Sequence, residues 1–185
     1  NYGDPVLFER CMESAKTMLE ISVRTPDGRR HIPSMHLDAS MRTKSKEFDV
    51  DGHANVLLWH AALETADYNR NPKILNVLRE YADTWLKYQK PKQWTTAIDV
   101  ASGEINKASA SERPLNGGYG GQAAFFSWLY KLTGDKRYLA PFLHFYAQGK
   151  IPWSIADYVA ALYNLGGLDD LPAATLDRLV EQHPF

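Results

Sequence analysis

This sequence of 185 residues contains a single cysteine, has almost no net charge and lacks long apolar runs. The single Cys11 excludes an internal disulfide and a cysteine-rich zinc site. A formal net charge of -1 gives no electrostatic basis for binding nucleic acid or an anionic membrane surface. No apolar run reaches the length of about 18 residues that a membrane-spanning helix needs. We therefore expect neither nucleic acid nor a membrane among the partners.

Apolar stretches of helix length that contain almost no charge are the main positive feature. They cover residues 51–66, 117–132 and 151–165 and are rich in alanine and aromatic residues. Each is followed within a few residues by a second helical stretch. A helix that is apolar on all sides must be buried, whereas an amphipathic helix lies at a surface. The pattern therefore predicts an all-α fold in which buried inner helices alternate with outer helices as hairpins.

Capping residues and prolines mark the helix boundaries. Asp4-Pro5 and Asn71-Pro72 each predict a helix start, with a polar cap followed by proline in the first turn. Asp51 is expected to cap the first inner helix, and Asp135 the outer helix that follows the second. The expected helices cover residues 5–21, 51–66, 72–89, 117–132, 135–148, 151–165 and 173–182.

Non-helical features and a repeat complete the expected organisation. Residues 93–104 combine a β-type run with a turn and predict one short β-hairpin insertion, and residues 25–28 are typical of a turn. The joints between inner and outer helices repeat, because residues 69–75 align with 133–139 and with 165–171. We thus expect three αα units, with helix 5–21 as the outer member of a preceding unit.

The N-terminal ends of inner helices carry the first candidate site residues. In a ring of hairpins these ends line one mouth of the cavity, and helix N-termini favour anions. Asp51, His53 and Asn55 form the densest polar cluster at such an end. His53 has the side chain of a general base near neutral pH, and Asn55 can hydrogen-bond a substrate carboxylate or hydroxyl. The alternative is that Asp51 only caps the helix and His53 only fills space.

The second and third inner helices carry further candidates. Glycines at 117–121 let the backbone approach a ligand closely, but their spacing is not that of a phosphate-binding loop. Tyr119 is a candidate proton donor or stacking platform, and Asn116 and Gln122 beside it are candidate substrate-binding residues. Asp157, the only charge in the third inner helix, is a candidate acid or a structural buried group.

Aromatic and histidine residues outside these ends give the remaining candidates. Trp94 and Trp153, each at the start of an element, are candidates for stacking on sugar rings, with a core position as the alternative. His36 in the irregular segment 29–50 is a candidate substrate-binding residue. His60 is predicted to be a satisfied core histidine. Because no histidine spacing matches a zinc pattern, we expect no metal and no cofactor.

A resemblance arises at the joint 133–139, Thr-Gly-Asp-Lys-Arg-Tyr-Leu, which follows an aromatic, alanine-rich helix. It resembles the hairpin turn of (α/α) toroid carbohydrate-active enzymes, such as six-hairpin glycosidases and toroid polysaccharide lyases. Asp51-Gly52-His53 before an inner helix and Tyr81-Ala82-Asp83-Thr84-Trp85 in the outer helix strengthen the likeness, which covers residues 51–171. It is a likeness of repeat style, and no family's complete catalytic motif is matched. Terpene cyclases and prenyltransferases share the style, but the chain has no Asp-rich motif for a diphosphate.

This resemblance implies a single helical-hairpin domain over residues 1–185 that forms a small toroid or part of a larger one. The rest of such a toroid would come from another chain or from a missing part of this one. It also implies a polysaccharide lyase or glycoside hydrolase that acts on an acidic, uronate-containing oligo- or polysaccharide, in the periplasm or outside the cell. A lyase would use His53, Asn55 and Tyr119, whereas a hydrolase needs two carboxylates, which would come from Asp49, Asp51 and Asp157. The alternative is a non-catalytic helical-repeat module that binds a protein or a glycan.

Overall fold

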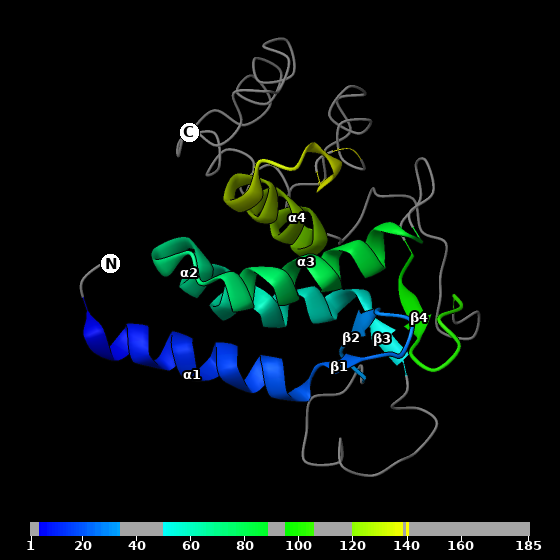
Figure 1. The fold of residues 1–185 in the computed structure, drawn as a ribbon, viewed down its shortest axis with the longest axis horizontal. Coiled ribbons are helices and arrows are strands. Elements are labelled where there is room, and N and C mark those ends of the chain that lie inside the picture. The colour runs from blue at the N-terminus through cyan, green and yellow to red at the C-terminus, as the bar shows by residue number, and fades with distance from the viewer. Residues whose placement is uncertain (1–3, 34–49, 89–94, 106–119, 139, 141–185) are drawn as a thin grey trace.

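The computed structural model of the chain describes residues 4–33, 50–88, 95–105, 120–138 and 140. These residues form a helix-rich fold with two small antiparallel sheets (Figure 1). None of the helices among them is long and apolar enough to cross a membrane. The expected helices 151–165 and 173–182, and most of 135–148, lie outside the described residues.

Helix α1 (Pro5–Ile21) begins where the sequence predicts it. The Asp4 side chain accepts a 3.0 Å hydrogen bond from the backbone N–H of Val6, and Pro5 occupies the first turn. After α1, strand β1 (Val23–Arg24) pairs antiparallel with β2 (Arg30–His31). The predicted turn at residues 25–28 joins these strands and is confirmed, but the strands themselves are not predicted.

The expectation that Asp51 caps an inner helix is wrong. Asp51 lies in strand β3 (Val50–Gly52), and the cap position of the following 3₁₀ helix η3 (His53–Trp59) belongs to Gly52, which makes no side-chain capping bond. Helix α2 (His60–Asn69) continues from η3. The predicted inner helix is therefore a strand, a 3₁₀ segment and an α-helix in succession. The physical reason is that the Asp51 carboxylate is used by donors in the core, as described below.

The turn of the β-hairpin predicted at residues 93–104 is confirmed. In the part of the chain that the structure describes, the two strands on either side of this turn pair only through a single bridge. The backbone N–H of Asp99 donates to the carbonyl of Glu104 at 2.8 Å, and a bridge joins Ile98 to Ile105. However, strand β4 (Ala97–Asp99) forms its main antiparallel pair with β3, which is distant in sequence. The fold therefore has two small sheets where the sequence predicts one insertion.

The two joints between helices share one geometry, residue for residue. Helix α3 (Pro72–Leu86) follows α2, and the short helix η4 (Lys136–Tyr138) follows α4 (Gly120–Thr133). Arg70 and Gly134 hold the same place after α2 and α4, and both take a left-handed conformation with φ of 53° and 70°. The next residue caps in both joints: Asn71 Oδ1 accepts from Lys73 N at 2.9 Å, and Asp135 Oδ1 accepts from Arg137 N at 3.0 Å. The predicted alignment of these two joints is confirmed.

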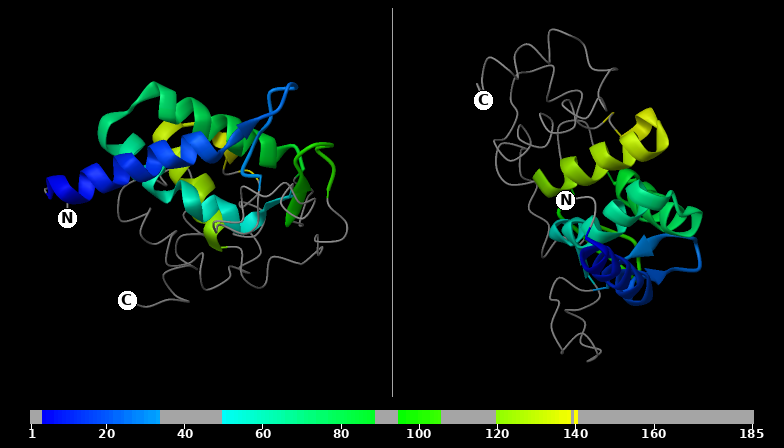
Figure 2. Two further views of the ribbon diagram at one scale, coloured as in Figure 1. Left: turned by 90° about the horizontal axis from the view of Figure 1, so that it is seen from below. Right: turned by 90° about the vertical axis from the view of Figure 1, so that its left-hand side faces the viewer.

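Helices α2 and α4 lie side by side and run in the same direction. Their C-terminal ends are joined by a 2.9 Å ion pair between Asp67 and Lys131 and by a hydrogen bond from Arg70 Nη1 to the Leu132 carbonyl. The elements that follow them also meet, since Tyr138 of η4 donates to Asp83 of α3 at 3.2 Å. Helix α1 packs on the side of the α2–α3 pair opposite to α4 (Figures 1 and 2).

The core between these helices is aromatic. In α4 the apolar character predicts burial correctly, while the first inner segment is only partly buried, because Leu57 is 57% exposed. His60 is also exposed, beside Glu64 and the ring of Trp128, so the prediction of a core histidine is wrong. The largest fully buried side chains in the described part of the chain include Trp59, Trp85, Tyr81, Tyr138 and Phe126.

Candidate functional site

Four elements bring polar side chains together around the Asp51 carboxylate. Asp51 of β3 is fully buried, and its Oδ1 accepts hydrogen bonds from Asn55 Nδ2 of η3 at 2.9 Å and from the Tyr81 hydroxyl of α3 at 3.2 Å. Its Oδ2 lies 3.2 Å from Nδ1 of His31 in β2, which is also fully buried. A buried carboxylate needs such donors, because an unpaired buried charge is strongly unfavourable. We call these four residues the Asp51 cluster.

Burial shifts the pKa values of two members of the Asp51 cluster upward. Burial raises the pKa of Asp51, and this effect outweighs the hydrogen bonds from His31 and Asn55, which lower it. Burial also raises the pKa of Tyr81 well above its usual range, and the neighbouring Asp51 charge adds to the shift. Tyr81 therefore remains a protonated donor at all ordinary pH values.

We expect the Asp51 carboxyl to make the protein less stable as the pH rises. Because its folded-state pKa is raised, the native state binds this proton more tightly than the unfolded chain does. The resulting stability is fully present below the unfolded pKa of about 4 and is lost as the pH rises through the folded pKa. Urea unfolding of the wild type and of Asp51→Asn at several pH values measures this contribution. The difference in unfolding free energy should favour the wild type most at the acidic end.

The comparison with Asp51→Asn isolates this one group. The pKa values of Asp27, Asp99 and Asp135 are lowered by their hydrogen bonds, so these groups contribute in the opposite direction. They are common to both proteins, and their contributions cancel in the difference. A difference that stays constant from acidic to neutral pH would contradict the prediction.

His53 stands at the start of η3, next to the Asp51 cluster in sequence. Its backbone N–H donates to the Thr96 carbonyl at 2.8 Å, and its ring Nδ1 lies 3.2 Å from the same oxygen. A carbonyl only accepts hydrogen bonds, so the proton of the neutral ring lies on Nδ1 and Nε2 is the basic atom. The half-buried position and fixed tautomer are compatible with the predicted role of general base.

Gln122 lies in the first turn of α4 and is 1% exposed. Among the described residues, neither its Nε2 nor its Oε1 has a hydrogen-bond partner. A buried amide without partners is costly and calls for a physical explanation. The predicted role in substrate binding is compatible with this observation.

A pocket of about 170 Å³ opens between the first inner segment and α4. It is large enough for a single ring, since a cavity of about 150 Å³ holds benzene. Six of its seven lining residues are apolar, which differs from the polar mouth that the sequence predicts. The lining residues are Val56, Leu57, His60, Leu63, Ala124, Phe125 and Trp128.

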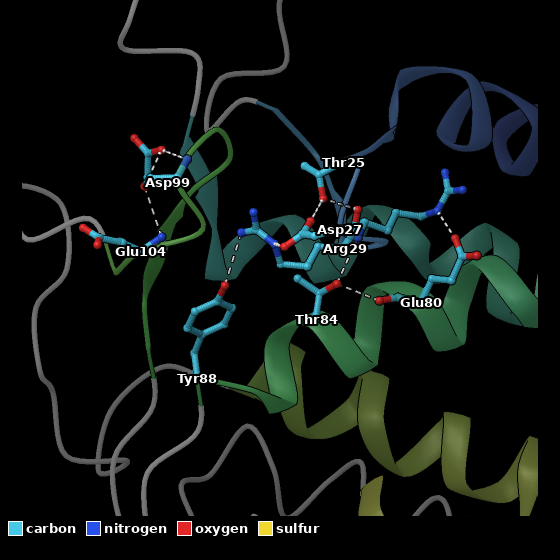
Figure 3. Close-up of polar contacts among 10 residues, drawn as sticks. Thr25, Asp27, Arg29, Glu80, Thr84, Tyr88, Asp99 and Glu104 are labelled. Atoms are coloured by element: carbon cyan, nitrogen blue, oxygen red, sulfur yellow. Dashed lines mark hydrogen bonds and ion pairs between the residues drawn. The ribbon is translucent and has the colours of Figure 1, made fainter.

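A second polar cluster ties the β1–β2 hairpin to the end of α3. Figure 3 shows the Arg29 guanidinium between the Asp27 carboxylate and the Tyr88 hydroxyl, with donor–acceptor distances of 2.6 and 3.3 Å. Hydrogen bonds from Thr25 and Arg29 lower the pKa of Asp27 to about 2. Nearby, the backbone N–H of Arg30 donates to Thr84 Oγ1 at 2.9 Å. This cluster holds the strand that carries His31 against α3.

The structure brings together two of the predicted site residues, Asp51 and Asn55, and places His53 directly between them in sequence. The burial of Asp51 favours a role in positioning the neighbouring side chains over direct contact with a polymeric substrate. The cluster members His31 and Tyr81 are not predicted from sequence as site residues. Their signals in the sequence are a histidine just after a predicted turn, and a tyrosine on the apolar face of helix 72–89 that also belongs to the segment 81–85 of the toroid resemblance. The other candidates lie outside the described residues: His36, Trp94, Asn116, Tyr119, Trp153 and Asp157.

Comparisons with known proteins identify no relative of this chain. The chain matches no protein-family model, no curated protein and no solved structure. In the part of the chain that the structure describes, no group of three His, Cys, Asp or Glu side chains is arranged to hold a metal ion. The features of the chain that bear on its function are therefore the Asp51 cluster, His53 and the repeated helical joints.

Proposed function

We propose that the chain belongs to a carbohydrate-active enzyme of (α/α) toroid style that cleaves an acidic, uronate-containing polysaccharide. The observation that carries the proposal is the shared geometry of the two joints, together with the parallel packing of α2 and α4. Parallel inner helices bring their N-terminal ends to one end of the pair. His53 and Gln122 therefore belong to the same end, where a toroid of this style would have its mouth.

Within this proposal, the described residues favour a lyase over a hydrolase. A hydrolase needs two carboxylates that flank the bond, whereas Asp51 is fully buried and surrounded by its donors. A lyase needs a base for the C5 proton and a group that binds the uronate carboxylate. The proposed base is His53 Nε2, and the candidate for the second role is the Asn55 amide, which is 4% exposed and donates its Nδ2–H to Asp51.

The proposed reaction is a β-elimination. His53 Nε2 takes the proton from C5, and the electron pair of that C–H bond forms the C4–C5 double bond. The C4–O bond breaks, and a proton donor, for which Tyr119 is the candidate, protonates the leaving oxygen. The products are an unsaturated uronate and a shortened chain, so no oxidant or water is consumed.

The proposal is tested by incubating the protein with a panel of uronate polymers, including pectate, alginate and hyaluronan. Formation of unsaturated uronate is followed by its ultraviolet absorbance, and hydrolysis by the release of reducing ends. His53→Gln is expected to lower kcat/KM by about 10²–10⁴-fold, because it removes a general base. Lys73→Gln is the control, since Lys73 is exposed in the first turn of α3 and does not line the ring-sized pocket, so this variant should leave the activity unchanged. Absence of both products across the panel would contradict both enzymatic forms of the proposal.

One observation favours the non-catalytic alternative, a helical-repeat module that binds a protein or a glycan. Leu57 and Tyr68 are large apolar residues that are 57% and 63% exposed on the first inner segment. Contiguous exposed apolar surface marks interaction sites, and Leu57 also borders the pocket of about 170 Å³. This alternative predicts polymer or protein binding without turnover, and no effect of His53→Gln on the affinity.

A further inference from the structure

We propose that the pocket of about 170 Å³ between the first inner segment and α4 binds a small phenolic compound, that is, an uncharged aromatic ring with one hydroxyl group. This site goes beyond the proposed function and does not depend on it. The proposed elimination reaction uses His53, Asn55 and Tyr119, and none of these residues lines the pocket. Binding of the phenolic compound and cleavage of a polymer can therefore be tested separately.

The size of the pocket limits the ligand to one ring. A cavity of about 150 Å³ lined by apolar side chains holds benzene. A volume of about 170 Å³ therefore admits one six-membered ring with a small substituent.

The inner part of the lining is apolar and is held in place by the core. Val56, Leu63, Ala124 and Phe125 are all buried. The Phe125 ring meets the ring of Tyr81 edge-on, with the ring centroids 5.8 Å apart. Because the core packs these side chains from behind, they can receive a ligand without the cost of rearrangement.

The chemistry of the lining selects an aromatic ring over a sugar ring or an ion. His60 is the one polar side chain among the seven that line the pocket. The several hydroxyl groups of a pyranose ring would lose their hydrogen bonds to water here without finding new partners, and a carboxylate or ammonium group would lose still more. An aromatic ring gives up no such bonds, and Phe125 and Trp128 offer it edge-to-face contacts.

His60 places one polar group at the exposed part of the lining. Its ring meets the ring of Trp128 edge-on, with the centroids 5.2 Å apart. Its Nε2 lies 3.7 Å from Glu64 Oε1, which is longer than a hydrogen bond. A neutral imidazole can both donate and accept hydrogen bonds, so it can pair with a single hydroxyl group on the ligand. This polar group favours a phenolic ring over a plain hydrocarbon ring.

The first experiment is methyl NMR of the full chain titrated with 4-methylphenol. Val56, Leu57, Leu63 and Ala124 carry methyl groups in the lining, and a bound aromatic ring shifts the signals of methyl groups close to it. We expect these signals to shift together with a dissociation constant of about 1 mM or lower. The methyl groups of Leu78, which is buried in α3 and does not line the pocket, should not shift.

Three results of this titration would overturn the proposal. They are the absence of shifts at the lining methyl groups, equal shifts at Leu78 and at the lining, and a response to methyl glucuronide in place of 4-methylphenol.

The second experiment repeats the titration with variants at exposed lining positions, where substitution does not disturb the core. His60→Leu should weaken binding of 4-methylphenol by about three- to tenfold, the loss of one hydrogen bond, and should leave binding of toluene nearly unchanged. Leu57→Ala should weaken binding of both compounds, because it removes apolar contact. Tyr68→Ala is the matched control, since Tyr68 is exposed to a similar degree and does not line the pocket.

These variants test the position of the ligand and the role of its hydroxyl group. If Leu57→Ala and His60→Leu both bind 4-methylphenol as the wild type does, the assigned site is wrong. If His60→Leu weakens toluene as much as 4-methylphenol, the hydrogen bond to the hydroxyl group is refuted. A loss in Tyr68→Ala as large as that in Leu57→Ala would also overturn the assignment to this pocket.

Discussion

Replacement of Asp51 by alanine is expected to lower the free energy of unfolding by about 3–5 kcal/mol. The substitution removes the acceptor of three buried donors, which belong to His31, Asn55 and Tyr81. Each unsatisfied buried donor costs about 1–3 kcal/mol, and the small side chain also leaves a void. Urea unfolding at neutral pH, followed by far-ultraviolet circular dichroism, measures the change.

Asp51→Asn is the matched control for this prediction. It keeps the size of the side chain and one acceptor oxygen, and it removes the cost of burying a charge. We expect its loss of stability to be less than half of that caused by Asp51→Ala. Equal losses in the two variants would mean that the carboxylate charge, and not the acceptor geometry, holds the cluster together.

Replacement of Gly103 by alanine is expected to be more damaging than the same change at Gly134. Both glycines take a left-handed conformation, with φ of 69° and 70°, so both substitutions incur a backbone cost of about 1–2 kcal/mol. At Gly134 a new Cβ would meet nothing within 4 Å. At Gly103 it would collide with the Arg29 guanidinium, which Asp27 and Tyr88 hold in place. Overpacking of this kind adds about 1–3 kcal/mol.

A double-mutant cycle separates the collision from the backbone strain. In an Arg29→Ala background the guanidinium is absent, so Gly103→Ala should cost no more than Gly134→Ala does in the wild type. The midpoints of urea unfolding of the wild type and the variants measure these differences. An unchanged cost of Gly103→Ala in the Arg29→Ala background would contradict the proposed contact as its cause.

Local sequence signals correctly predict the starts of α1 and α3 and the two joints after α2 and α4. Asp4-Pro5 and Asn71-Pro72 mark the true starts of α1 and α3, because capping and proline geometry depend on only a few neighbouring residues. The same holds for the joints after α2 and α4, where a left-handed residue followed by a capping side chain repeats.

Long-range contacts explain what the sequence does not predict. An aspartate before an apolar run is usually a helix cap, and the role of Asp51 as a core acceptor depends on His31 and Tyr81, which lie far away along the chain. The pairing of β3 with β4 is likewise non-local, and such short strands carry no register of their own. For the candidate site, the sequence predicts Asp51, His53 and Asn55 as neighbours, but not the side chains that hold Asp51.

The contacts between the C-terminal ends of α2 and α4 have a mechanical consequence. Asp67 and Lys131 form a largely buried ion pair, and Arg70 donates a hydrogen bond to the Leu132 carbonyl beside it. The two helices are therefore attached to each other at their C-terminal ends. At the other end of the pair α4 packs against η3, so α4 is held against the first inner segment at both ends. The ring-sized pocket lies between these two attachments and takes its lining from both sides. The space for a bound molecule is therefore set by the fixed spacing of two attached helices, which packed interiors resist changing.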